Sequence, residues 1–126
     1  MYADQATTTI SRAETAYNRA ASFIDALSAL DSSMSLGAVR VLLFVAKNQD
    51  RQGGVTTSDL KDELGLSSAA ASRYSYYWSY GHADPTHATS AMMDMVIDTK
   101  DRRKRLLRLT DKGELFLRSV RRDLLD

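Results

Sequence analysis

Two short segments with helical character, joined by a glycine turn, constrain the fold of this chain more than any other feature. The first spans residues 58–64, and Thr57 is placed to cap its N-terminus. Gly65 follows directly, at the position where glycine commonly ends a helix. Ser67 is placed to cap a second segment over residues 68–80. Two short helices joined by so tight a turn predict a helix-turn-helix.

A basic hairpin is predicted downstream of these helices. Residues 93–97 alternate between apolar and polar side chains, and residues 105–109 form the expected return strand. The turn between them reads KDRRK (100–104), and the stretch 100–108 holds six basic residues against Asp101 alone. A charge this concentrated favours an anionic partner. A helix-turn-helix followed by a basic hairpin predicts a winged helix, with the hairpin tip as the wing.

Long helices are predicted at both ends of the chain. One spans residues 5–30, and the other covers residues 111–126 after Thr110, which is placed as its N-cap. The first helix has an apolar stripe that favours packing on a second copy of the chain, although an amphipathic helix in a monomer core would show the same spacing. The residues of this stripe predicted for dimerisation are Ile10, Ala13, Tyr17, Ala20, Ile24 and Leu27. The main apolar stripe of the last helix is formed by Leu117, Val120 and Leu124.

The expected fold class is mainly α with a small β-hairpin wing (α+β). A chain of 126 residues has the length of one domain. We divide residues 1–126 into an N-terminal helix (5–30), a winged helix-turn-helix core (35–110) and a C-terminal helix (111–126). Ser35 is the expected N-cap of a further helix that is apolar on most sides and therefore central.

Several function classes are excluded by what the sequence lacks. It has no cysteine, so a disulfide framework and thiolate chemistry are ruled out. No apolar run reaches the length of a membrane span, and the N-terminus has no signal-peptide pattern, so we expect a cytoplasmic protein. No catalytic motif occurs, so an enzyme is not expected.

The two histidines are the candidates for a metal site. His82, Asp84 and His87 have a spacing that three ligands can use. They lie in a polar loop (82–91) where no second layer of residues is evident to orient them. We therefore expect no bound metal and no cofactor.

Two surfaces are candidates for contact with double-stranded DNA. Helical spacing in segment 68–80 turns one face inwards, namely Ala71, Tyr74, Ser75 and Trp78. Outward serine and arginine side chains can hydrogen-bond bases or phosphates, and wing arginines can enter the minor groove. Arg73 has the alternative of an ion pair with Asp59 or Asp62. The predicted DNA-binding residues are Ser67, Ser68, Ala69, Ser72, Arg73, Tyr76, Lys100, Arg102, Arg103, Lys104 and Arg105.

Three stretches resemble the MarR family of winged-helix transcriptional regulators. They are MSLGAVRVLLFVA (34–46), LGLSSAAASR (64–73) and DRRKRLLRLTDKG (101–113), and the likeness covers residues 34–120. The resemblance implies an obligate dimer formed by both terminal helices, which adds Leu117, Val120 and Leu124 to the residues predicted for dimerisation. The resemblance further implies recognition helices in successive major grooves and wings in the flanking minor grooves. It also implies that Arg102 or Arg103 enters the minor groove while Asp101 braces the tip.

The loop at residues 82–91 departs from the family pattern, because 20 residues separate Gly81 from Arg102. We interpret it as an insertion, of a kind also found in proteins of phages and mobile elements. The resemblance further allows a small-molecule effector, although a packed core is the better explanation of the same residues. The candidates to line such a pocket are Tyr17, Phe23, Met34, Trp78 and Tyr80.

Together these features predict a homodimeric, sequence-specific DNA-binding regulator that acts as a repressor and is associated with the nucleoid. An alternative follows from the recognition helix, which carries a single basic residue among alanines and serines. The domain would then bind a protein, such as a polymerase or another regulator, with little affinity for DNA. A further alternative is a chain that coats DNA without regard to sequence, which predicts steep salt dependence without discrimination between sites.

Overall fold

The computed structural model describes residues 2–81 and 86–125, apart from the side chains of residues 2–10 and 123. The described elements, in chain order, are α1 (Tyr2–Leu30), α2 (Leu36–Asn48), β1 (Val55–Thr56), α3 (Thr57–Leu64), α4 (Ser68–Tyr80), β2 (Met93–Ile97), β3 (Arg105–Leu109) and α5 (Asp111–Leu125). This order confirms the predicted fold class, mainly α with a β-hairpin wing. Within the described residues, no helix is long and apolar enough to cross a membrane.

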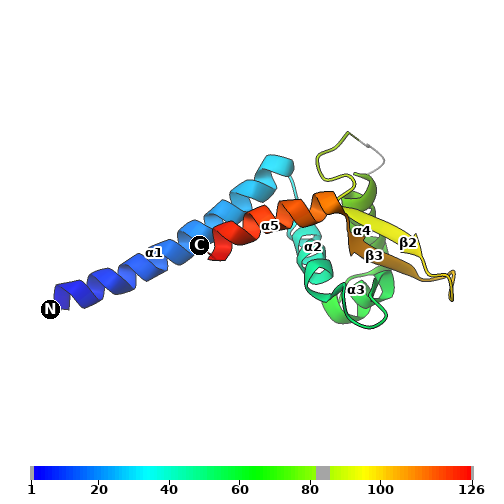
Figure 1. Cartoon of the computed structure of the whole chain (residues 1–126), viewed down its shortest axis with the longest axis horizontal. Coiled ribbons are helices and arrows are strands. Elements are labelled where there is room, and N and C mark those ends of the chain that lie inside the picture. Colours follow the sequence, from blue (N-terminus) through cyan, green and yellow to red (C-terminus); the bar gives the residue numbers. More distant parts are fainter. Residues whose placement is uncertain (1, 82–85, 126) are drawn as a thin grey trace.

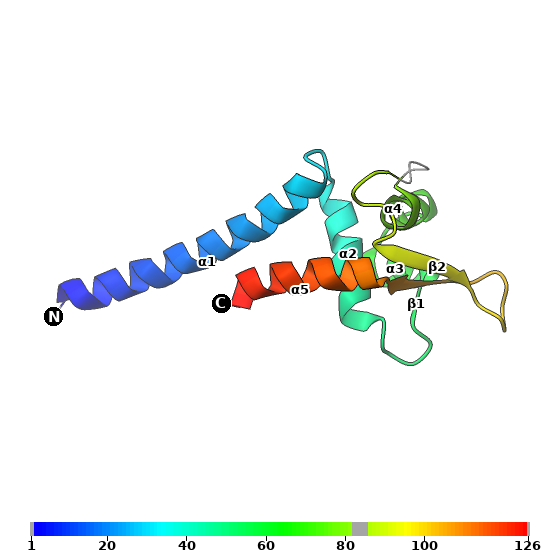
Figure 2. The ribbon, with the colours of Figure 1, turned by 45° about the horizontal axis from the view of Figure 1, so that its top comes forward.

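The two terminal helices project away from a compact winged-helix body. In Figures 1 and 2, α5 runs beside α1, while the N-terminal half of α1 continues well past the end of α5. The β2–β3 hairpin extends from the opposite end of the molecule (Figure 1). The helices proposed for dimerisation and the wing therefore lie at opposite ends of the chain's long axis.

The small sheet joins the wing to the helix-turn-helix. Its strand order is β1-β3-β2, and both pairings are antiparallel. Met93 pairs with Leu109 and Ile97 pairs with Arg105, while Val55 of β1 pairs with Leu107. Because side chains alternate along a strand, Leu107 points into the core and is fully buried. β1 therefore anchors the central strand directly before α3 begins.

The core is built around α2 and α4. Val41, Leu42 and Val45 of α2 are completely buried, as expected for a central helix. Trp78 of α4 is also completely buried, and its indole Nε1–H donates to the carbonyl oxygen of Ala38 at 2.8 Å. The predicted inward face of α4 is confirmed, since Ala71 and Ser75 are buried and Tyr74 is half-buried. This packing holds the opposite face of α4 outwards.

The helix ends follow the predicted caps with one exception. Ser35 Oγ accepts from the backbone N–H of Ala38 at 3.1 Å. Ser67 Oγ accepts from that of Ala70 at 3.0 Å. Gly65 ends α3 with a φ of 70°, in the left-handed region that glycine adopts without strain. The expected caps therefore fix both ends of the turn between α3 and α4.

The prediction that Thr57 caps α3 is wrong by one residue. The cap is Thr56, which belongs to β1 as well. Its hydroxyl accepts from the N–H of Asp59 at 3.1 Å, and the Asp59 carboxylate accepts from the N–H of Thr56 at 2.8 Å. This reciprocal pair satisfies two helix-end donors, which Thr57 could not do with the residue three positions later, Leu60.

Candidate nucleic-acid interface

The outer face of α4 is small and polar along its first two turns. Ser67, Ser68, Ala69 and Ser72 are all exposed, as predicted from the helical spacing. Tyr76 follows one turn later and is 46% exposed, and its ring lies 5.5 Å from the ring of Tyr80. Short side chains let a helix backbone approach another surface closely, and serine hydroxyls can donate or accept. This face can therefore read groups presented in a groove.

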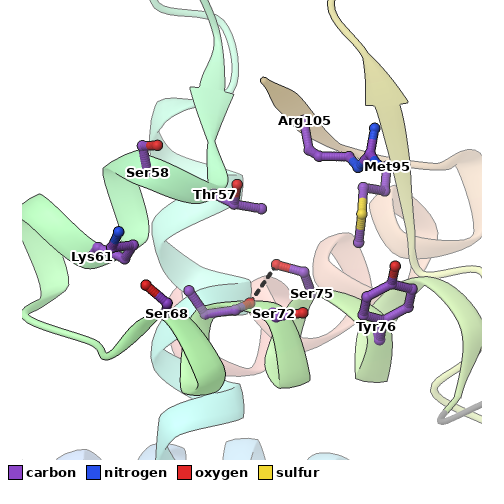
Figure 3. Close-up of a pocket in the computed structure, with 10 residues that line it drawn as sticks. Thr57, Ser58, Lys61, Ser68, Ser72, Ser75, Tyr76, Met95 and Arg105 are labelled. Carbon is purple, nitrogen blue, oxygen red and sulfur yellow. Dashed lines mark hydrogen bonds between the residues drawn. The ribbon is translucent and has the colours of Figure 1, made fainter. Parts of the chain in front are cut away.

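A depression of about 370 Å³ lies between α3, α4 and the base of the wing. Figure 3 shows Ser68, Ser72 and Tyr76 on its α4 side, with Arg105 opposite them. Ser75 also lines it, but its hydroxyl donates to the carbonyl oxygen of Ala71 at 2.7 Å, within the helix. The depression places the start of α4 and a wing arginine on one continuous surface.

Three residues of α3 complete this surface and were missed by sequence reasoning. Thr57, Ser58 and Lys61 line the same depression, facing the start of α4 (Figure 3). The signal that could have identified them is their spacing, because residues four apart on a helix share one face. Their hydroxyl and ammonium groups suit contacts with phosphate.

The wing tip presents a cluster of cationic side chains. Lys100, Arg102, Arg103 and Lys104 are exposed, and Arg105 at the base is half-buried. The tip is closed by backbone bonds, with the N–H of Asp98 donating to the carbonyl oxygen of Lys104 at 3.0 Å. The cluster therefore sits on an ordered turn that projects beyond the rest of the molecule (Figure 1).

Asp101 distinguishes the two neighbouring wing arginines. Its Oδ1 accepts from the backbone N–H of Arg103 at 3.1 Å and from Arg103 Nε at 3.3 Å. The N–H of Lys104 donates to the Asp101 carbonyl oxygen at 2.9 Å. Within the described part of the chain, no ion pair engages Arg102. The carboxylate thus fastens the guanidinium of Arg103 to the turn, whereas Arg102 is exposed and has no described carboxylate partner.

Arg73 lies apart from the depression lined by Ser68 and Ser72. Its guanidinium stacks over the ring of Tyr74 at 5.0 Å, and it borders a second depression with Asp31. Hydrogen bonds with Ser35 and then with Arg73 lower the pKa of the Tyr74 hydroxyl. Arg73 therefore stands at one edge of the exposed α4 face.

Arg51, and not Arg73, neutralises two of the three acidic residues of α3. Arg51 Nη2 lies 3.0 Å from Asp59 Oδ2, and its two Nη atoms bind both carboxylate oxygens of Glu63. The hydrogen bond from Arg51 lowers the pKa of Glu63. Burial raises the pKa of Asp59, but bonds from Thr56 and Arg51 outweigh it and lower that pKa overall. Asp59, one of the two partners considered for Arg73, is thus paired with a residue outside the helix-turn-helix.

Most of the residues predicted for dimerisation lie at the surface of α1 or of α5. Ala13 and Ala20 are exposed, Tyr17 is 74% exposed and Ile24 is 47% exposed. An apolar groove of about 300 Å³ lies between α1, α2 and α5, and it is lined by Phe23, Leu43, Ala46, Lys47, Leu117, Val120, Arg121 and Leu124.

Two residues of the predicted dimerisation set are instead core residues of the single chain. Leu27 is 3% exposed and Val120 is 2% exposed, because α1 and α5 pack against each other there. The spacing of an apolar stripe does not distinguish contacts within the chain from contacts to a partner. The side chain of Ile10 lies outside the described residues.

The structure separates the other candidate sites. His82 and Asp84 lie outside the described residues, and His87 lies 4.0 Å from Asp31. The described part of the chain holds no group of three metal-ligating side chains. The candidates for an effector pocket have different surroundings, since Trp78 is fully buried while Tyr17 is exposed on α1.

Comparison with known proteins adds information on the fold. No protein-family model matches the sequence, and no curated protein matches it. The structure is similar to RV1404 from Mycobacterium tuberculosis (TM-score 0.59, 20% identity, 98% of this chain and 71% of that chain covered). It is also similar to a MarR transcriptional regulator from Methanosarcina mazei (TM-score 0.57, 16% identity, 97% of this chain and 73% of that chain covered). A further similar structure is the YusO protein from Bacillus subtilis (TM-score 0.58, 18% identity, 97% of this chain and 77% of that chain covered).

Proposed function

Because the chain has a MarR-like winged-helix fold, we propose that it is a sequence-specific DNA-binding transcriptional regulator, acting as a homodimeric repressor. One observation carries the proposal: α3, the outer face of α4 and Arg105 of the wing line a single depression. A duplex that lies across this surface contacts hydroxyls, a lysine and an arginine together. The function needs no catalysis and no cofactor, and it places the protein on DNA in the cytoplasm.

The recognition helix reads bases through its first two turns. Ser68 and Ser72 hydrogen-bond base edges in the major groove, and Ala69 lets the helix come close to them. Tyr76 contacts the groove wall, and Arg73, at the edge of the face, contacts a phosphate. Ser67, Thr57 and Lys61 support the docking through the DNA backbone. Base contacts set the sequence, whereas phosphate contacts set the register.

The wing contributes affinity through charge. Arg102, which no described carboxylate engages, enters the minor groove, where the potential is most negative. Arg103 stays on the turn with Asp101, and Lys100 and Lys104 neutralise phosphates on either side. Asp101 thereby orders the tip although its own charge opposes DNA.

A second copy of the chain covers the exposed surface of α1 and α5. Between residues 11 and 22, every side chain except Arg19 is exposed. Helices gain most of their stability from packing an apolar face, so this stretch needs a partner. Tyr17, Ile24 and the groove beside Leu124 supply the apolar surface, and pairing of two copies presents two recognition helices to two half-sites.

The experiment that tests this function is recovery of bound fragments from the fragmented genomic DNA of the source organism. At near-physiological salt, we expect a few enriched fragments that share an inverted repeat. Uniform recovery of all fragments would show a coating protein, and no recovery would favour a protein-binding module. Either result contradicts the proposal.

A further inference from the structure

A short segment that is buried except at Ala91 lies between the recognition helix and the wing. It covers residues 89–92, where Thr89 is fully buried and Met92 is 2% exposed. Ala91 has a φ of 60°, in the left-handed region that side chains other than glycine rarely adopt. Such a conformation persists only when its surroundings hold it in place. The contacts of this segment therefore identify what it does.

On one side, the segment binds the C-terminal end of α4. The last carbonyl groups of a helix lack partners within the helix. Here the N–H of Met92 donates to the carbonyl oxygen of Trp78 at 2.9 Å, and the N–H of Ala91 donates to that of Ser79 at 3.0 Å. Thr89 Oγ1 donates to the carbonyl oxygen of Tyr77 at 3.3 Å. Three successive carbonyls of the recognition helix are thus held by one segment.

On the other side, the same segment binds the first turn of α5. The N–H of Thr110 donates to the carbonyl oxygen of Met92 at 3.1 Å, and its hydroxyl donates to that of Ala91. Lys112 Nζ donates to the carbonyl oxygen of Ser90 at 2.6 Å. Every carbonyl from 90 to 92 therefore faces α5, while the amides of 91 and 92 face α4.

We propose that residues 89–92 form a strap by which α5 sets the orientation of α4, with Thr110 and Lys112 as positioning residues for DNA recognition. The inference rests on the proposed function, because its consequence is read in DNA binding. α5 packs on α1, and both helices form the proposed dimer interface. The strap then fixes each recognition helix relative to its partner, and so fixes the spacing of the two half-sites.

Lys112 offers the cleanest test of the strap. Its side chain is exposed, and within the described residues no carboxylate pairs with it. Thr110 is less suitable, because its hydroxyl also accepts from the N–H of Gly113 at 3.1 Å and so caps α5. Replacing Lys112 by methionine keeps the length of the side chain and removes the ammonium donor. Arg118, another exposed basic residue of α5, provides the matched control for charge.

The experiment measures how strongly each protein discriminates between half-site spacings. A site is selected from random duplexes with the wild-type protein, and a second site is made with one extra base pair at its centre. We expect wild type and Arg118→Met to discriminate equally. Lys112→Met should discriminate about fivefold less, the order expected for loss of one hydrogen bond made by an exposed side chain. Its affinity for unrelated DNA should match that of Arg118→Met.

Amide hydrogen exchange without DNA gives the second readout. The amides of Ala91 and Met92 should exchange about fivefold faster in Lys112→Met than in Arg118→Met, at an unchanged melting temperature. Wild-type spacing discrimination in Lys112→Met would overturn the strap, as would unchanged exchange of these two amides. A wild-type protein that prefers no sequence and no spacing would instead overturn the proposed function.

Discussion

Replacement of Gly113 by alanine tests whether the strap is rigid. Gly113 lies in the first turn of α5, and a Cβ built there would collide with the backbone carbonyl oxygen of Met92. That oxygen already accepts from the N–H of Thr110 at 3.1 Å, so it cannot move without breaking this bond. Because the collision is with backbone, which cannot rotate away as a side chain can, the cost falls in the upper part of the range for overpacking, about 2–3 kcal/mol. The higher helix propensity of alanine returns about 1 kcal/mol.

We therefore expect Gly113→Ala to lower the free energy of unfolding by about 1–2 kcal/mol. With a urea slope of about 1–2 kcal/mol/M, the midpoint falls by about 1 M. Urea unfolding followed by circular dichroism at one fixed protein concentration measures this, since dimerisation makes stability depend on concentration. Ser119→Ala, at an exposed position of the same helix, should change the midpoint little. A Gly113→Ala protein as stable as wild type would refute the reasoning.

Three further predictions concern the wing arginines, the proposed dimer interface and the carboxylate of Asp31. Arg102→Ala should weaken DNA binding more than Arg103→Ala and reduce the salt slope by about one, because Asp101 holds Arg103; equal losses in a titration at several salt concentrations would contradict this. Ile24→Glu should give monomers by light scattering, since it puts a charge on the exposed stripe; a mass of two chains would remove α1 from the interface. The bond from the Tyr77 hydroxyl and those from Ser33 lower the pKa of Asp31, so its contribution to stability is complete above pH 3.8 and is lost as pH falls further. The free energy of unfolding should therefore fall less for Asp31→Asn than for the wild type when urea titrations at pH 5 and pH 3 are compared. An equal fall in the two proteins would show that this carboxylate does not cause the pH dependence.

The helix-turn-helix could be predicted because its signals are local. Ser35, Ser67 and Gly65 act on their own helix ends, and short-range backbone chemistry decides such positions. The outward face of α4 followed from helical spacing for the same reason. The cap of α3 was misplaced because Thr56 and Thr57 are identical in sequence terms. What separates them is the residue three positions later, Asp59, which completes a reciprocal cap only with Thr56.

Contacts between distant segments could not be predicted in this way. Arg51 lies in a turn-rich segment, yet it forms ion pairs with both Asp59 and Glu63. Arg73 instead stacks over the ring of Tyr74. Leu27 and the exposed Ile24 belong to one apolar stripe, but only packing of α1 against α5 decides which of them is buried. Pairings of this type depend on the three-dimensional arrangement, which hydrophobic periodicity does not encode.

The two ends of the loop that follows α4 are held at the same carbonyl group. The chain leaves α4 at Gly81, whose N–H donates to the carbonyl oxygen of Tyr77 at 3.1 Å. It returns at Thr89, whose hydroxyl donates to the same oxygen at 3.3 Å. A loop whose two ends are fixed at one point adds only a slowly growing closure entropy as it lengthens. The number of residues between Gly81 and Thr89 is therefore uncoupled from the orientation of α4. Shortening that loop by two residues should leave the half-site spacing preference unchanged, whereas loosening Lys112 should reduce it.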